Sequence, residues 1–254
     1  MGDDRVLTED GSPTLFSREY GEHYHNLSGA FLESRERYVV PCRVAERAAA
    51  GGVRLLDVGF GLGFNLALAW AAVRATAPGA ALRIVSLEKA PIPADLWRGL
   101  AAELLEPIII EGVAELLERG EHSRGMVSLK LSVGRAEDTI ERVGERFDGV
   151  FLDPFSPDRN PELWTPRFLA AIRRRVDEGA ILSTYSAAVR VRVALLRAGW
   201  RIGAGPRVGR KSSGTLASAG EVVPPLPPLP PRETRRLERK ARESRDDGAD
   251  DAIC

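Results

Sequence analysis

Short apolar runs rich in β-branched residues alternate along this chain with longer amphipathic stretches, and this alternation restricts the fold more than any other feature. Each apolar run predicts a buried strand, and each amphipathic stretch predicts a helix. A repeated strand–helix order is typical of an α/β fold with helices on both faces of a doubly wound, mostly parallel sheet. The expected strands are 53–58, 82–88, 127–133, 147–153 and 180–185. The expected helices are 65–75, 93–105, 137–143, 165–175 and 187–198. Residues 201–208 and 215–219 predict a closing antiparallel hairpin, which makes a sheet of seven strands.

The two ends of the chain depart from this alternation. Residues 1–50 predict a cap segment, in which His23-Tyr24-His25-Asn26 precedes an amphipathic stretch expected to cover the site. Residues 51–222 are expected to form the α/β domain, and residues 223–254 a tail. The tail opens with six prolines among eight residues, which favour extended polyproline geometry. Residues 232–245 then carry seven basic and three acidic side chains, which predict either a solvated helix or an arm that follows RNA phosphates.

Composition limits the class of protein. The 254 residues are 44% hydrophobic and 28% charged, as in ordinary globular proteins. No stretch approaches the roughly 20 apolar residues of a membrane span, and the acidic N-terminus has no features of a secretory signal, so we expect no membrane and a cytoplasmic location. The net charge of zero means that any RNA contact must be local. Cys42 and Cys254 lack metal-ligand spacing, and no metal is expected.

A closely spaced glycine triplet follows the first expected strand. Gly59, Gly61 and Gly63 stand where the backbone must turn sharply and come close to a ligand. Dinucleotide enzymes use the spacing G-x-G-x-x-G to hold a pyrophosphate, whereas this chain has G-x-G-x-G. With Asp57 ahead of the turn and Glu88 at the end of the next strand, the pattern predicts a nucleoside ligand without pyrophosphate, whose ribose hydroxyls Glu88 binds. The alternatives are an ordinary strand–helix turn and a solvated carboxylate.

An acidic residue leaves the fourth expected strand at its carboxyl end, where open α/β sheets bind ligands. Asp153 is followed by Pro154 and Phe155, which resembles the D-P-P-[YF] loop of methyltransferases that modify exocyclic amines. A fixed carboxylate that accepts the N–H groups of an amine directs its lone pair towards an electrophile. Phe155 is suited to stack on an unstacked base. The alternative is that Asp153 only caps a turn.

Several longer motifs resemble the MnmC methyltransferase-domain family, which makes 5-methylaminomethyl(-2-thio)uridine at the wobble position of certain tRNAs. The most specific is Phe151–Trp164, similar to the family pattern F-L-D-x-F-x-P-x-x-N-P-x-x-W. The other similar segments are Asp57–Asn65, Ser86–Pro91, Thr184–Ala187, Gly209–Lys211 and the pair Glu33-Ser34.

The resemblance implies a Rossmann-like class I methyltransferase that uses S-adenosylmethionine. It implies cofactor binding by Asp57, Gly59, Gly61, Gly63, Asn65, Glu88 and Asp153. It also implies catalytic roles for Asp153 and Phe155, with Asp153 meeting the aminomethyl group of the wobble uridine. Its candidates for tRNA phosphates are Arg190, Arg192, Arg210 and Lys211. Trp164 is expected either to stack on a nucleotide or to be buried at a helix entry.

Two departures from the family pattern matter. Arg135 stands where the family has an aspartate that contacts adenine, so that contact is expected from Glu137 or Asp138. The chain also shows no flavin-dependent oxidase segment, so we expect a stand-alone enzyme without flavin, whose aminomethyl substrate a separate enzyme supplies.

Two rival interpretations stay open on the sequence alone. An aminopropyltransferase of the spermidine-synthase type would need an acidic residue three positions before Asp153, where Val150 stands. A non-catalytic module that binds nucleosides or RNA would have no use for the Asp153 loop.

Overall fold

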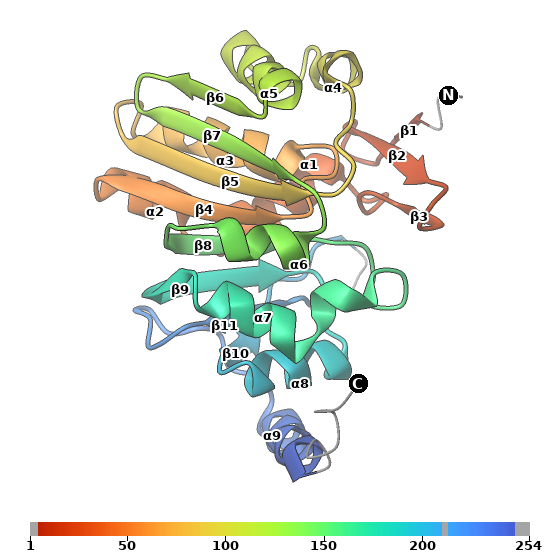
Figure 1. The fold of residues 1–254 in the computed structure, drawn as a ribbon, viewed down its shortest axis with the longest axis vertical. Coiled ribbons are helices and arrows are strands. Elements are labelled where there is room, and N and C mark those ends of the chain that lie inside the picture. The colour runs from red at the N-terminus through yellow and green to blue at the C-terminus, as the bar shows by residue number, and fades with distance from the viewer. Residues whose placement is uncertain (1–4, 210–212, 247–254) are drawn as a thin grey trace.

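The computed structural model describes residues 5–209 and 213–246, which fold around one large sheet (Figure 1). Its strand order is β10-β11-β9-β8-β4-β5-β7-β6. The five central strands, from β9 to β7, are parallel. The strands are β4 (Gly52–Val58), β5 (Ala81–Glu88), β6 (Glu121–Arg124), β7 (Val127–Val133), β8 (Phe147–Leu152), β9 (Val176–Thr184), β10 (Arg201–Ala204) and β11 (Thr215–Ser218). The doubly wound α/β fold expected from the sequence is therefore confirmed.

Helices cover both faces of this sheet, with α6, α7 and α8 on one face and α2, α3, α4 and α5 on the other (Figure 1). The helices that follow the first sheet strand are α3 (Phe64–Thr76), α4 (Ala94–Ala101), α5 (Pro107–Arg119), α6 (Ala136–Thr139), α7 (Pro166–Arg173) and α8 (Val189–Arg197). Short 3-10 turns occupy Ile140–Arg142 and Pro161–Trp164.

Alternation along the central strands divides the interior into two hydrophobic cores. In β4, Leu55 faces the core that contains Trp70 of α3, whereas its neighbour Leu56 faces the core that contains Phe168 of α7. Successive side chains of a strand point to opposite faces, so a strand covered on both sides is apolar at every position. This is why β4 carries apolar residues at the consecutive positions Leu55 and Leu56 instead of a strict alternation with polar ones.

The expected number of seven strands is wrong, because the sheet has eight. The additional strand, β6, pairs antiparallel with β7 at the edge of the sheet. Its sequence Glu-His-Ser-Arg has one buried residue among four, so it carries no apolar alternation that would predict a strand. Helix α5 was also not predicted, although Pro107 at its first position and Gly120 at its end are ordinary boundary signals. The closing hairpin of β10 and β11 is confirmed.

The N-terminal segment forms a small antiparallel sheet of its own, in the order β1-β2-β3. It lies beside the carboxyl ends of β4 and β5 (Figure 1). The elements of this segment are β1 (Arg5–Leu7), β2 (Pro13–Ser17), β3 (Glu22–His23), α1 (Ala30–Glu33), a π-helix (Ser34–Val39) and α2 (Val44–Ala49).

The C-terminal segment packs onto the same domain. Helix α9 (Pro231–Asp246) lies against α8 and buries Leu237 completely. The proline-rich segment before it runs beside β10, where the amide of Ala204 donates to the Pro227 carbonyl at 2.7 Å. The domain limits at residues 50 and 222 stay a prediction. Within the described part of the chain, no helix has the length and apolar character required to span a bilayer.

Candidate active site

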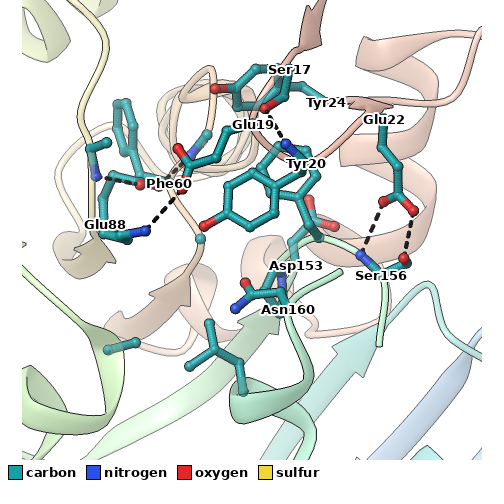
Figure 2. Close-up of a pocket in the computed structure, with 18 of the residues that line it drawn as sticks. Ser17, Glu19, Tyr20, Glu22, Tyr24, Phe60, Glu88, Asp153, Ser156 and Asn160 are labelled. Carbon is teal, nitrogen blue, oxygen red and sulfur yellow. Dashed lines mark hydrogen bonds and ion pairs between the residues drawn. The ribbon is translucent and has the colours of Figure 1, made fainter. Parts of the chain in front are cut away.

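A cavity of about 620 Å³ opens at the carboxyl ends of the central strands. It is lined by the turn after β4, the end of β5, the start of α6 and the loop after β8, and the N-terminal segment closes it from outside (Figure 2). In a doubly wound sheet this edge is where ligands bind, because the strand order reverses there and leaves a crevice. Six of the expected site residues line this cavity: Gly59, Gly61, Glu88, Glu137, Asp153 and Phe155.

The glycine turn after β4 adopts backbone conformations that other residues disfavour. Gly59, Gly61 and Gly63 have φ values of +86°, +55° and +83°. A β-carbon on Gly59 would lie 2.8 Å from the carbonyl oxygen of Asp153. Gly59 and Gly61 line the cavity, whereas Gly63 packs against the ring of Phe60. The triplet thus brings bare backbone to the cavity wall, as its spacing predicts.

Glu88 lies at the end of β5 and faces the cavity (Figure 2). Its carboxylate accepts hydrogen bonds from the amides of Gly61, at 3.0 Å, and Ala90, at 2.9 Å. These two donors hold the carboxylate in one orientation, and its remaining lone pairs are available to a ligand. Glu137 also lines the cavity and pairs with Arg135 at 2.7 Å, whereas Asp138 is exposed and does not line it.

Asp153 lines the floor of the cavity directly after β8. One carboxylate oxygen accepts a very short hydrogen bond from the hydroxyl of Tyr38, and the other accepts from Asn65 Nδ2 at 2.8 Å. Burial and the charge of Glu33 raise the pKa of Asp153 well above its usual value, while the bonds from Tyr38 and Asn65 act to lower it. Burial therefore favours the neutral form of this carboxyl more than in an exposed aspartate, and its two hydrogen bonds oppose that effect.

Aromatic rings gather above Asp153. Phe155 stacks on Tyr20 with 4.1 Å between ring centroids and contacts Tyr24 edge to face. Glu22 accepts hydrogen bonds from the amide of Ser156, at 3.1 Å, and from its hydroxyl, at 2.5 Å (Figure 2). The N-terminal segment therefore holds two tyrosines over the loop after β8, at the place where a flat substrate would enter.

The cavity has a strongly acidic lining. Among the described residues that line it, seven are acidic and two are basic, and the two basic ones, Lys89 and Arg135, are paired with Glu19 and Glu137. Such a lining repels phosphates and favours a cationic ligand. In the described residues we find no group of three or more His, Cys, Asp or Glu side chains that would hold a metal ion.

Two predicted site residues lie behind the cavity rather than on its wall. Asp57 is fully buried and accepts a hydrogen bond from Ser86 Oγ at 2.8 Å, and burial raises its pKa to about 7. Asn65 is 3% exposed and reaches the cavity only through its bond to Asp153. Asn65 therefore supports the Asp153 carboxylate, and neither residue lines the cavity in this arrangement.

The four candidates for tRNA phosphates are not equivalent. Arg190 is half exposed and pairs with Asp158 at 2.7 Å. Arg192 is 3% exposed, pairs with Glu233 of α9 and donates to Thr215 Oγ1 at 2.9 Å. Because its guanidinium is buried and already paired within the protein, it is not available to a tRNA phosphate. Arg210 and Lys211 lie outside the described residues.

Other site residues were not predicted from the sequence, or were predicted without a role. Tyr38, which bonds Asp153, had no motif to single it out. Glu33 belonged to a noted motif and lines the cavity, and Tyr185, from the noted Thr184–Ala187 segment, does so as well. Trp164 is buried and donates from Nε1 to the Phe155 carbonyl at 3.0 Å, so it supports the loop after β8 from below.

Comparisons with known proteins agree with this geometry. A family model described as S-adenosyl-L-methionine-dependent methyltransferase matches residues 101–220. The tRNA 5-methylaminomethyl-2-thiouridine biosynthesis bifunctional protein MnmC of Pseudomonas paraeruginosa is 35% identical over 216 residues, which cover 80% of this chain and 33% of that protein. Its counterpart in Chromobacterium violaceum is 32% identical over 220 residues, covering 82% and 33%.

A solved structure is similar over most of both chains. The crystal structure of MNMC2 from Aquifex aeolicus has a TM-score of 0.81 and 38% sequence identity, and the match covers 93% of this chain and 76% of that one. The chain spans about a third of the length of the bifunctional relatives.

Proposed function

The chain belongs to the MnmC methyltransferase-domain family of S-adenosylmethionine-dependent methyltransferases, and we propose that it methylates the 5-aminomethyl nitrogen of wobble uridine in tRNA. The product would be 5-methylaminomethyl(-2-thio)uridine. The observation that carries this proposal is the position of Asp153: a buried, oriented carboxylate adjoins the glycine turn and lies beneath aromatic rings.

The cavity fits S-adenosylmethionine in shape and in charge. When bound, this cofactor supplies an electrophilic methyl group on a sulfonium cation. Glu88 would accept hydrogen bonds from both ribose hydroxyls, and Glu137 would make the adenine contact that an aspartate makes in the family, since both residues line the cavity. The acidic lining favours a cation and disfavours the pyrophosphate of a dinucleotide. Gly59 and Gly61 keep the wall free of side chains where the ligand would lie against backbone.

Asp153 would act on the amine. An alkylammonium ordinarily titrates near pH 10.4, so the substrate must release one proton to solvent before its nitrogen attacks. The carboxylate accepts N–H bonds from the neutral amine and directs its lone pair towards the methyl carbon. The nitrogen gains a methyl group as the sulfur–carbon bond breaks, and the extra proton passes to Asp153, whose raised pKa suits a proton acceptor.

The base would be held by stacking. Phe155 offers a flat ring beside Asp153, and the base of an unstacked wobble uridine would take the position that Tyr20 occupies beside it. For the base to take this position, Tyr20 and the N-terminal segment that carries it would have to move away from Phe155. The hydrogen bonds between Glu22 and Ser156 would break in that movement. Half-exposed Arg190 is the described candidate for a tRNA phosphate. We further propose that the protein acts in the cytoplasm and that a separate enzyme supplies the aminomethyl group.

The test is a methylation assay with labelled S-adenosylmethionine and tRNA from cells that lack this modification. We expect label in 5-methylaminomethyl(-2-thio)uridine, and we expect Asp153→Ala to abolish turnover while cofactor binding persists. Asp95→Ala, a matched change of an exposed aspartate outside the cavity, should leave activity unchanged. Cofactor binding without transfer to any tRNA would refute the proposal and favour a non-catalytic module. Transfer of an aminopropyl group to a small amine would favour the spermidine-synthase alternative, against which buried Val150 speaks.

A further inference from the structure

The N-terminal segment contributes a third set of polar residues to the cavity, and neither the proposed adenosine contacts nor the proposed base contacts use it. Its members are His25, Asn26 and Glu33. Glu33 is the last residue of α1, at the start of the π-helix, and is 7% exposed. A carboxylate that is this deeply buried requires compensation for its lost hydration.

The compensation that the described residues give to Glu33 is incomplete. Its Oε2 accepts from the amide of Asn26 at 2.8 Å, and its Oε1 lies 3.4 Å from Nε of Arg37 without a hydrogen bond between them. Arg37 is 1% exposed and also donates to the Pro206 carbonyl at 3.3 Å. Among the described residues, Arg37 thus gives Glu33 an ion-pair partner but no hydrogen bond from its Nε, so Oε1 of Glu33 keeps lone pairs that a ligand could satisfy.

A second observation points to a ligand at the same end of the cavity. His25 is nine-tenths buried, lines the cavity, and has no hydrogen-bond partner at Nδ1 among the residues that the structure describes. Burial lowers the pKa of His25 to about 4, so the ring is neutral at pH 7 and offers one donor and one acceptor. A buried polar atom without a partner is rare in a folded protein unless a ligand or water supplies one.

We propose that Glu33 binds a primary ammonium group of a ligand and that His25 makes a hydrogen bond to the same ligand. This inference rests on the proposed function for the identity of the ligand. Two molecules would bring an ammonium here: the cofactor, through the α-ammonium of its methionine part, and the tRNA, through the 5-aminomethyl group. The ammonium would donate charge-assisted hydrogen bonds to the lone pairs of Glu33 that Arg37 leaves free.

Calorimetric binding to Glu33→Gln distinguishes the two sources. S-adenosylhomocysteine carries the α-ammonium, whereas 5′-methylthioadenosine has the same nucleoside without the amino-acid part. If the cofactor is the source, the variant binds S-adenosylhomocysteine about ten-fold or more weakly and binds 5′-methylthioadenosine unchanged, as expected for the loss of one charged hydrogen bond. If the tRNA is the source, both nucleosides bind as in wild type, and the KM for aminomethyl-bearing tRNA rises about ten-fold or more.

Glu36→Gln is the matched control, since Glu36 lies in the same π-helix but is partly exposed and pairs only with Arg35, at 3.5 Å, on the surface. It should change none of these constants. Unchanged binding of both nucleosides together with an unchanged KM in Glu33→Gln would overturn the proposal. Should Glu33→Gln not fold, Glu33→Asp is used instead, because it keeps the carboxylate on a side chain that is shorter by one methylene. Unchanged binding of both nucleosides together with an unchanged KM in Glu33→Asp would also overturn the proposal. Selective loss of S-adenosylhomocysteine binding in a protein that methylates no tRNA would refute the proposed function and leave this subsite intact.

Discussion

The hydrogen bond from Tyr38 to Asp153 is the contact through which the N-terminal segment is expected to control the chemistry. Tyr38 is fully buried, and burial together with the charge of Asp153 raises its pKa well above the ordinary value, so its hydroxyl stays protonated and donates. In Tyr38→Phe the carboxylate keeps only the bond from Asn65. A buried hydrogen bond to a charged group contributes about 1.5–3 kcal/mol, which corresponds to about a 10- to 150-fold change.

The direction of the effect follows from the pKa of Asp153. An aspartate that must be ionised gives activity that rises as the pH increases through its pKa, and the Tyr38 bond lowers that pKa. In Tyr38→Phe the rising limb of kcat/KM against pH should therefore move to higher pH. At pH values below the pKa of Asp153, kcat/KM of Tyr38→Phe should be about 10- to 150-fold lower than that of wild type. The difference should become smaller as the pH rises.

A matched control separates this effect from a general loss of packing. Tyr185→Phe removes a hydroxyl that lines the same cavity but donates to the Pro154 carbonyl, at 3.0 Å, instead of to Asp153. It should leave the position of the limb unchanged. A Tyr38→Phe profile that coincides with wild type, or one lowered by the same factor at every pH, would refute the reasoning.

Three further outcomes follow from the site. Glu88→Ala should weaken S-adenosylhomocysteine binding about 10- to 150-fold by calorimetry; Asp95→Ala, at an exposed position, should have no effect, and equal affinities of the two variants would exclude the ribose role of Glu88. Gly59→Ala should lower the free energy of unfolding in urea by at least about 1–2 kcal/mol, because φ is +86° and the new β-carbon would lie 2.8 Å from the Asp153 carbonyl oxygen; wild-type stability would contradict this geometry. Because burial raises the pKa of Asp57 to about 7, its ionisation opposes folding, so stability should fall as the pH rises from about 4 to 7. Asp57→Asn should remove up to roughly 4 kcal/mol of this decrease in the free energy of unfolding. An equal decrease in wild type and in Asp57→Asn over this pH range would refute the raised pKa of Asp57.

Local patterns determined much of this protein from the sequence alone. The strand–helix alternation predicts the doubly wound sheet, because strands buried on both faces are mostly apolar on both faces. The glycine triplet predicts positive φ at three positions, because bare backbone is needed there whatever surrounds it. Asp153 was placed at the cavity because the carboxyl end of a parallel strand always lies at the ligand edge of the sheet.

Only the tertiary structure decided which distant residues meet at that edge. Tyr38 and Asp153 are 115 positions apart, and Glu22 and Ser156 are 134 apart, so no spacing in the sequence relates them. Strand β6 is a short polar edge strand, which pairs through its backbone and needs no apolar pattern.

Arg192 illustrates the physical reason for this division. Its neighbours in sequence resemble an exposed basic surface, but α9 folds back and brings Glu233 onto it, so its charge is buried and paired. Backbone conformation depends mostly on near neighbours in the chain. The burial and pairing of a charge depend on whatever packs over it, which is set by the whole fold.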